Sequence, residues 1–511
     1  MRGNKVRKKR TKEFPNPYSL KNAFAKGSIF TRLSAVVMGL GNIVYGQIVK
    51  GLLFLAVEVG YILYMINYGS SCLGKFFKLG GRAEADVWDD AQGIYVPGVQ
   101  DRTIEFLLYG VVAIGITVLF IIIWKSAISS SYKAQCEKAE GKRPASFRQD
   151  LKSLTDKNLN RLLLALPVTG VVVFTVLPLV FMICMAFTTY DLNHPLVFNW
   201  NGLANFGKAL NLKDSIGQEF WPVLGWTLCW AVAATFSNFI LGTILAIVIN
   251  RKGTKLKSMW RINFMLSAAI PQFVSLLLMR TMFNDNGIIN TLLINAHVLT
   301  KGISFWQSTF WARFLVIMIN IWVGVPFTMM QVTGVLQNIP SDLYEAAKVD
   351  GAGPIRIFFK ITLPYLLFVT GPYLITSFTG NINNFNVIFL LSAGGPTKNL
   401  ASTSGKTDLL VTWLYKLTVG TDRPYYNIGA VIGIFTFIIL ASVSLLTYHR
   451  TGASRTGILV LTRTRRDSNN EKSIIRSKSK KNYRKHIRIY YSYSVINYLA
   501  FPNRLDCTYQ L

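Results

Sequence analysis

The sequence predicts an all-helical membrane protein with about eight transmembrane helices. Its 511 residues are 51% apolar and 15% charged, whereas charged residues make up about a quarter of an average soluble protein. The apolar residues also fall in long blocks separated by short polar stretches, which is typical of a chain that crosses a bilayer repeatedly. These two observations exclude an ordinary soluble enzyme.

A helix needs about 20 mostly apolar residues to cross a bilayer, and several segments of the chain satisfy this requirement. The expected spans are residues 51–68, 104–124, 162–187, 222–249, 262–283, 311–335, 362–380 and 426–447. Residues 33–48 are also apolar, but they are few and are interrupted by Gly and Asn. We expect this segment to lie at the membrane interface or to form a re-entrant loop.

The charge of the loops predicts the orientation, because cytoplasmic loops carry the excess of Lys and Arg. Residues 125–161 contain nine Lys and Arg and residues 250–261 contain five, so both are expected inside, as are the two termini. The cation-poor segments expected outside are 69–103, 188–221, 284–310 and 381–425. This alternation also places residues 336–361 on the cytoplasmic side.

The chain divides into a membrane-embedded part flanked by basic ends. The expected parts are a basic cytoplasmic tail (1–32), an N-terminal membrane segment with two spans (33–160), a transmembrane core (161–450) and a basic, disordered tail (451–511). A basic surface can bind nucleic acid, but basic ends of a membrane protein also face anionic lipid. We favour membrane lipid and expect no nucleic-acid partner.

Few chemically active groups are present in the spans. Glu58 and Arg280 are the main ionisable residues there, and their scarcity argues against a proton-coupled carrier.

Gly405-Lys406-Thr407 resembles the end of a phosphate-binding loop, but Leu400 stands where the leading Gly belongs. The four histidines have no metal-ligand spacing. We therefore expect neither an enzyme nor a bound cofactor or metal.

The segment 339–364, IPSDLYEAAKVDGAGPIRIFFKITLP, predicts a helix, a turn and a second helix. Ser341 is a suitable N-cap and Asp342 favours a first helical turn. Gly351 suits the left-handed residue that ends a helix, and Pro354 suits the start of the next one. Such a helix can dock into the groove of a partner, or it can simply connect two spans.

The same segment resembles the EAA loop of ABC-transporter permease subunits, the membrane components of binding-protein-dependent importers. The resemblance implies the type I importer permease fold, with a loop that docks onto a separate ATP-hydrolysing subunit. The residues that it assigns to this coupling are Glu345, Ala346, Ala347, Asp350, Gly351, Ile361, Leu363 and Pro364.

Further stretches resemble the maltose and maltodextrin permeases, in particular their larger, F-type subunit. They are residues 320–327 (NIWVGVPF), 381–385 (NINNF), 394–396 (GGP) and 407–411 (TDLLV). The resemblance implies an oligosaccharide substrate, a second homologous permease, two copies of an ABC ATPase and an extracellular solute-binding lipoprotein. The short segment 188–221 lacks the large insert of the enteric permeases, which favours a Gram-positive source and a cell-membrane location.

The resemblance also assigns sugar contacts to Asn320, Trp322, Val323, Gly324, Phe327, Gly380, Asn381 and Asn384. Carboxamides both donate and accept hydrogen bonds, and aromatic rings offer flat apolar faces, so both suit sugar chemistry. Gly380 departs from the family, which has an aromatic residue there. The alternative is that these Asn side chains join helices to one another.

Other functions remain open at this stage. Galacto-oligosaccharide permeases share the same pattern, so the sequence does not decide the sugar. A secondary transporter would need coupling-ion residues or internal repeats, and we find neither. A membrane scaffold whose basic tails recruit partners is the third possibility.

Overall fold

The structure, a computed structural model, describes residues 19–80, 87–89, 93–96, 101–156, 158–191, 194, 196–251, 253–399, 401–420 and 424–450. Most of the basic N-terminal tail and the whole tail 451–511 lie outside these residues, so the prediction of disorder there stays a prediction.

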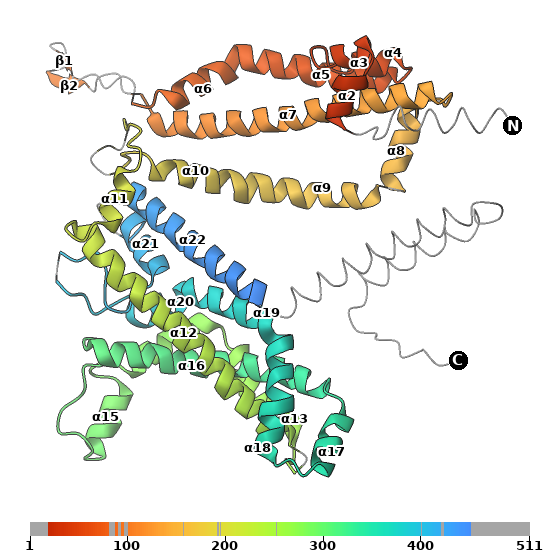
Figure 1. Ribbon diagram of the computed structural model, residues 1–511. Coiled ribbons are helices and arrows are strands. Elements are labelled where there is room, and N and C mark those ends of the chain that lie inside the picture. Colours follow the sequence, from red (N-terminus) through yellow and green to blue (C-terminus); the bar gives the residue numbers. More distant parts are fainter. Residues whose placement is uncertain are drawn as a thin grey trace. The chain divides into compact units, whose positions relative to one another are not determined.

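The described residues are mainly helical (Figure 1). The first elements are α2 (Leu20–Lys26), α3 (Ile29–Leu33), α4 (Leu40–Val44), α5 (Ile48–Tyr64), the π-helical turn η1 (Met65–Gly69), α6 (Ser70–Phe77), β1 (Val87–Asp89), β2 (Ile94–Val96), α7 (Thr103–Ala139), α8 (Phe147–Thr155), α9 (Leu159–Val171), η2 (Val172–Val176), α10 (Leu177–Ala186) and α11 (Ala204–Leu210). They are followed by α12 (Ser215–Asn250), α13 (Lys257–Ala269), α14 (Gln272–Met282), α15 (Ile288–Asn295), α16 (Thr309–Gln337), α17 (Ser341–Val349), α18 (Pro354–Ile357), η3 (Phe358–Thr362), α19 (Leu363–Ile382), α20 (Phe385–Ser392), α21 (Leu410–Thr418) and α22 (Tyr426–Arg450).

Seven helices in the described residues are long and apolar enough to cross a membrane, and a bent pair raises the number to eight. The seven are Ile48–Phe77, Thr103–Ala139, Leu162–Ala186, Ser215–Asn250, Thr309–Gln337, Pro354–Ser392 and Tyr426–Thr447. The range Pro354–Ser392 includes a short break between α19 and α20. Each expected span coincides with one of these helices or with the bent pair, so the predicted helical membrane fold is confirmed. A short antiparallel hairpin, β1–β2, lies between the first two spans.

The expected fifth span, residues 262–283, is a broken helix. Its halves α13 and α14 meet at an angle of 83°. The bend lies at Ile270 and Pro271, where Ile270 is extended (φ −78°, ψ 132°). A proline lacks the N–H needed to continue a helix and pushes the preceding residue out of the helical region. The expected span 262–283 is therefore present as a bent pair of helices.

The segment 33–48 contains the end of α3 and all of α4, and neither helix is long enough to cross a bilayer. The turn between the two helices is held from outside the segment, since Glu58 accepts a hydrogen bond from the backbone N–H of Met38 at 2.7 Å. The indole of Trp124 donates to the carbonyl of Ala35 at 2.8 Å. Glu58 therefore has a structural partner in the turn between α3 and α4.

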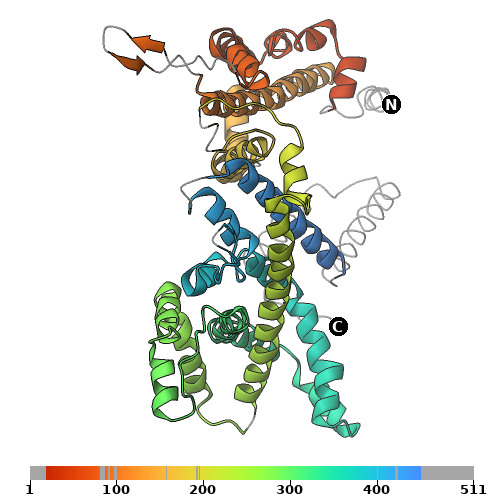
Figure 2. The ribbon, with the colours of Figure 1, turned by 90° about the vertical axis from the view of Figure 1, so that its left-hand side faces the viewer.

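The described residues form two compact units. One contains the described chain up to Asn338 together with Thr376–Val443, and the other contains Ile339–Ile375. In the first unit, α12 packs along α16 (Figures 1 and 2). Gly242 permits this approach, since a Cβ atom there would lie 2.7 Å from the Cβ of Thr328. Small residues at helix contacts are typical of membrane bundles.

The core of this unit joins helices that are distant in sequence. Trp230 of α12, Leu276 of α14, Ile319 of α16 and Val387 of α20 are buried in one cluster. α20 is a short helix inside this core, and it follows directly on the break after α19. The packing therefore brings the expected sugar contacts of α16 and of the α19–α20 break onto the same bundle.

Candidate functional site

The break between α19 and α20 is built from two carboxamides. The amide of Asn381 donates to Thr235 Oγ1 of α12 at 2.9 Å. The backbone carbonyl of Asn381 accepts from the Trp230 indole N–H at 3.0 Å. Asn384 is the N-cap of α20, since its Oδ1 accepts from the N–H of Val387 at 3.3 Å. The side-chain amide of Asn384 also donates to Oδ1 of Asn381 at 3.5 Å.

These hydrogen bonds show what the two residues do in the bundle. Asn381 attaches the break to α12, and Asn384 satisfies a backbone N–H at the start of α20. This is the role of joining helices that was considered as the alternative to sugar binding. A capping Asn contributes about 1 kcal/mol to a helix. The two roles do not exclude each other, because a carboxamide has several donor and acceptor positions.

Asn320 of α16 differs from these two residues because its amide is uncommitted. The side chain is 5% exposed, and its Nδ2 has no hydrogen-bond partner among the described residues. The same holds for Oδ1 of Asn238 on α12. Asn238 lies directly against α16 at Gly324, since a Cβ atom added to Gly324 would lie 2.3 Å from Nδ2 of Asn238. Gly324 is one helical turn after Asn320, so the two Asn side chains lie near the same point of α16.

Asn238 is a polar residue that the sequence analysis did not single out. The signal was present, because an Asn in the middle of the fourth apolar span is unusual. Unpaired buried polar groups cost about 1–3 kcal/mol each. The unpaired atoms of Asn320 and Asn238 are therefore available for a bond to a polar group from outside the chain.

The aromatic candidates are placed less favourably. Each residue turns a helix by about 100°, so Val323, Gly324 and Phe327 share a face with Asn320, whereas Trp322 lies on the opposite side. Val323 packs against the core of the unit. Trp322 and Phe327 are 41% and 52% exposed. Gly380 has open space around it, with no atom within 4 Å of a Cβ placed there.

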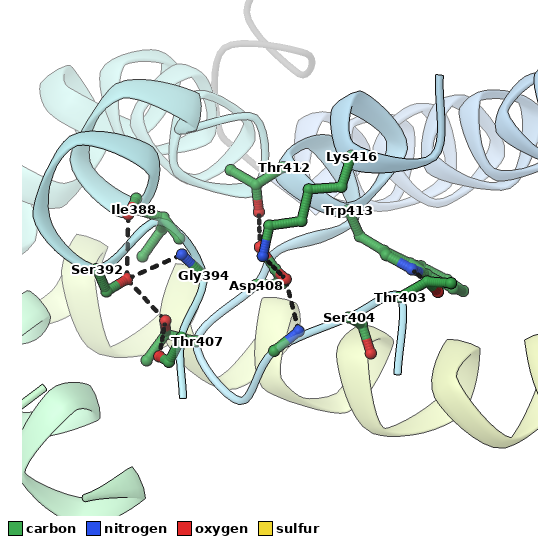
Figure 3. Close-up of polar contacts among 12 residues, drawn as sticks. Ile388, Ser392, Gly394, Thr403, Ser404, Thr407, Asp408, Thr412, Trp413 and Lys416 are labelled. Carbon is green, nitrogen blue, oxygen red and sulfur yellow. Dashed lines mark hydrogen bonds and ion pairs between the residues drawn. The ribbon is translucent and has the colours of Figure 1, made fainter. Parts of the chain in front are cut away.

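A second polar cluster lies in the loop between α20 and α21, centred on Asp408 (Figure 3). Asp408 is fully buried. Its Oδ2 accepts from Lys416 Nζ and from the N–H of Gly405, both at 2.6 Å. Its Oδ1 accepts from Thr412 Oγ1 at 2.9 Å. Burial raises the pKa of Asp408, and Lys416 and the hydrogen bonds oppose this shift.

The loop can close around Asp408 because of one glycine. Gly394 has φ +79°, and a Cβ atom there would lie 1.9 Å from Oδ1 of Asp408. A side chain at this position is therefore excluded both by backbone conformation and by space. In the sequence, residues 407–411 show only a resemblance to the maltose and maltodextrin permeases, and no local pattern indicates that Asp408 is buried.

The segment 339–364 lies in the other compact unit and folds as predicted into helix, turn and helix (Figure 1). Gly351 has φ +71° and ends α17. Pro354 starts α18. Ser341 is not the N-cap, because Pro340 precedes the helix and its carbonyl accepts the first bond, from Leu343. Ser341 instead donates to the carboxylate of Asp342.

The entry into the seventh span also differs from the prediction. The helix is continuous from Pro354, well before Pro364. A π-helical turn, η3, directly precedes α19, in which Pro364 is the second residue. A π turn rearranges the hydrogen bonds of the backbone where Pro364 has no N–H to donate.

The coupling candidates are mostly accessible in this unit. Glu345, Ala346, Asp350, Gly351 and Pro364 are exposed, and Ala347, Ile361 and Leu363 are partly exposed. Tyr344 of α17 contacts Thr362 through their hydroxyls at 3.2 Å, which ties α17 to η3. An apolar hollow of about 500 Å³ lies on α18 and η3, between Gly353 and Lys360.

Comparison with known proteins identifies the family. Residues 238–450 match the model of the binding-protein-dependent transport system inner membrane component. The maltodextrin transport system permease protein MdxF of Bacillus subtilis is 33% identical over 431 residues, covering 82% of this chain and 95% of the relative. The chain belongs to this transport family. The prediction of a membrane permease related to the maltodextrin systems is thereby confirmed.

Other members show how far the similarity reaches. The galactooligosaccharides transport system permease protein GanP of Bacillus subtilis is 30% identical and covers 82% of this chain and 96% of its own length. The maltose/maltodextrin transport system permease protein MalF of Yersinia pestis is 34% identical, but over only 48% of this chain and 46% of its own. A solved bacterial ABC transporter for alginate import aligns with a TM-score of 0.49 at 22% identity, covering 59% of this chain and 97% of that chain.

The burial of Asp408 leads to a testable prediction about the stability of the folded protein. Asp408→Ala removes the acceptor of Lys416, Gly405 and Thr412, and breaking a buried ion pair in this way costs about 3–5 kcal/mol. We expect a clear fall in the unfolding midpoint of the purified protein in nanodiscs. Asp285→Ala is the matched control, because Asp285 is exposed and exposed substitutions change stability by about 0.5 kcal/mol or less. Equal effects of the two substitutions would contradict the role of Asp408.

Proposed function

We propose that this permease carries oligosaccharides of the maltodextrin type into the cell as one half of an ATP-driven importer. The observation that carries the proposal is the similarity to MdxF over 95% of that protein's length. A second homologous permease completes the path, two copies of an ABC ATPase drive it, and an extracellular solute-binding lipoprotein delivers the sugar. The subunit itself performs no bond chemistry, and it works by binding the sugar and its partners differently in its different states.

The proposed orientation follows from the loop charges. Both termini and the segment 339–364 lie on the cytoplasmic side of the cell membrane of a Gram-positive bacterium, and the loops rich in acidic and neutral residues lie outside. The loop between α20 and α21 is then external, and the helix–turn–helix α17–α18 faces the cytoplasm.

The exposed unit α17–α18 is the proposed contact with the ATPase. Leu343, Val349, Ile355 and Phe359 are large apolar side chains between 48% and 86% exposed. Exposed apolar residues gathered on a short helical unit are typical of a surface that a partner covers. Of the residues assigned above to ATPase coupling, Glu345 to Gly351 lie in α17 and the turn after it, and Ile361, Leu363 and Pro364 follow in η3 and at the start of α19.

In the proposed sugar path, Asn320 and Asn238 contact the oligosaccharide directly. Their uncommitted amide and carbonyl atoms can bond to hydroxyls that both donate and accept. Asn381 and Asn384 shape the path by holding the break between α19 and α20 in place. Val323, Gly324, Phe327 and Gly380 remain proposed contacts, with Trp322 the least favourably placed of the set.

A galacto-oligosaccharide is the second candidate substrate. GanP covers nearly the same share of this chain as MdxF does, at 30% identity. Sugars of both classes present hydroxyls to carboxamides, so the described site does not favour either one by charge.

The function is tested by uptake of a panel of labelled oligosaccharides in cells with and without this chain. We expect maltodextrin uptake that depends on ATP and on the chain. In the purified complex, sugar-loaded binding protein should stimulate ATP hydrolysis. Uptake driven by an ion gradient without ATP would contradict the proposal and favour a carrier.

The uncommitted amide of Asn320 gives a specific prediction. Asn320→Ala should raise the sugar concentration for half-maximal uptake about tenfold, because one hydrogen bond to the sugar is lost in a buried setting. The basal ATPase activity and the assembly of the complex should not change. Met318→Ala, on the opposite side of the same helix, is the control and should transport normally. An unchanged half-maximal concentration in Asn320→Ala would remove this residue from the site.

The two glycines of the α17–α18 turn allow a test of coupling. Gly351 has φ +71° and Gly353 has φ −69°, and neither has an atom within 4 Å of an added Cβ. Gly351→Ala should therefore strain the turn by about 1 kcal/mol or more, while Gly353→Ala should fit. We expect sugar-stimulated ATPase activity to fall several-fold in Gly351→Ala only. Equal activities of the two variants would argue that this turn does not transmit motion.

A further inference from the structure

A small polar pocket lies where the start of α12 and the start of α16 meet the loop between α20 and α21. Its volume is about 90 Å³, and its lining includes Trp226 and Glu219 of α12, Arg313 of α16, and Lys398 and Lys406 of the loop. None of these residues belongs to the proposed sugar path or to the ATPase contact.

The acidic groups of the pocket already have partners. The Glu219 carboxylate accepts from the N–H groups of Thr403 at 3.0 Å and Ser404 at 2.8 Å, which fastens the loop to α12. Asp408, which also lines the pocket, is bound by Lys416 and two further donors (Figure 3). Lys416 therefore balances the charge of Asp408, whereas Glu219 is bound only by neutral donors and keeps its negative charge.

The basic groups, by contrast, are uncommitted. The ammonium groups of Lys398 and Lys406 have no ion pair or hydrogen bond in the part of the chain that the structure describes. Arg313 uses only its Nε, which donates to the carbonyl of Lys406 at 2.9 Å. Its guanidinium lies 4.2 Å from the centre of the Trp226 ring. The stacking holds the guanidinium in place and leaves its two terminal nitrogens as donors.

The three basic groups outnumber the one unbalanced carboxylate, that of Glu219, so the pocket offers free donors and an excess of positive charge. A group that fits must be an anion rich in acceptor oxygens, such as a carboxylate. The volume of the pocket further limits which anionic group can enter it. A volume of 90 Å³ corresponds to about three water molecules at ~30 Å³ each. A carboxylate at the end of a side chain fits this space, but a whole sugar ring does not.

The partner must reach the pocket from outside the cell. The lining comes from residues 218–226, Arg313 and residues 398–408, which lie in or next to the segments placed outside by the charge of the loops. We propose that this pocket receives one acidic side chain, Asp or Glu, of the extracellular solute-binding protein and fixes its docking position. This inference rests on the proposed function, which supplies that partner.

Docking at this point would lie close to the sugar path. Trp226 donates its indole N–H to the carbonyl of Thr407 at 3.1 Å. Trp230, which bonds to Asn381, follows one turn later on α12, about 6 Å along the helix axis. An acidic side chain in the pocket would therefore neutralise Arg313 within one helical turn of the residues that hold the α19–α20 break.

The test compares two charge-reversed transporters, each assembled as the whole complex in nanodiscs of neutral lipid. One carries Lys398→Glu and Lys406→Glu. The control carries Lys208→Glu and Lys213→Glu, which change two exposed lysines of another external segment by the same charge. The measured quantity is the Kd of the sugar-loaded binding protein at low and at high salt.

We expect the pocket variant to bind at least about tenfold more weakly at low salt, with a smaller salt dependence, and the control to change less than about twofold. A carbodiimide, which joins a carboxylate to an amine, should link Lys398 or Lys406 of the wild-type complex to an Asp or Glu of the binding protein. Peptide mass spectrometry identifies that bond.

Equal Kd values for the two variants would overturn the proposal. An effect seen only in nanodiscs containing anionic lipid would also overturn it, because the pocket would then bind a headgroup phosphate. These failures can be told apart from failure of the proposed function. If wild-type complexes import sugar but the pocket variant docks normally, only the pocket assignment is wrong.

Discussion

The constraint on which this structure depends is that every backbone N–H and C=O within the bilayer must find a partner in the protein itself. Long helices satisfy this constraint by themselves, so the elements that cross the membrane are helices. Wherever the helices are interrupted, the chain has to supply other partners. The interruptions are therefore the places where specific side chains matter most, and the α19–α20 break is the clearest example.

At that break the partners are carboxamides. Asn384 caps α20, and Asn381 joins the break to α12 through its side chain and its carbonyl. Asn320 and Asn238 keep unpaired polar atoms at the contact of α12 with α16. The same residue type thus has two uses in one bundle. Committed amides stabilise an irregular backbone, and uncommitted amides provide the groups that a hydroxyl-rich solute needs.

The irregular backbone of the loop between α20 and α21 is held in place by two carboxylates. Asp408 gathers three donors around a buried carboxylate, and Glu219 binds the backbone of the same loop from α12. Lys416 balances Asp408, whereas Arg313, Lys398 and Lys406 share only the charge of Glu219. The excess of positive charge at this pocket follows from that pairing.

The sequence by itself determined the number and place of the spans, because crossing a bilayer depends on local length and hydrophobicity. It also determined the helix–turn–helix of residues 341–357, since Gly351 and Pro354 act through their own backbone geometry. Tertiary structure alone decided that Asn381 binds Thr235, that Asn238 lies against Gly324, and that Asp408 is buried beside Gly394. Those pairs depend on which distant helices pack together, and no local pattern records that packing. The start of α17 shows the same limit on a smaller scale. Ser341 has a side chain that suits an N-cap, but the helix begins one residue earlier than expected and Pro340 occupies the N-cap position.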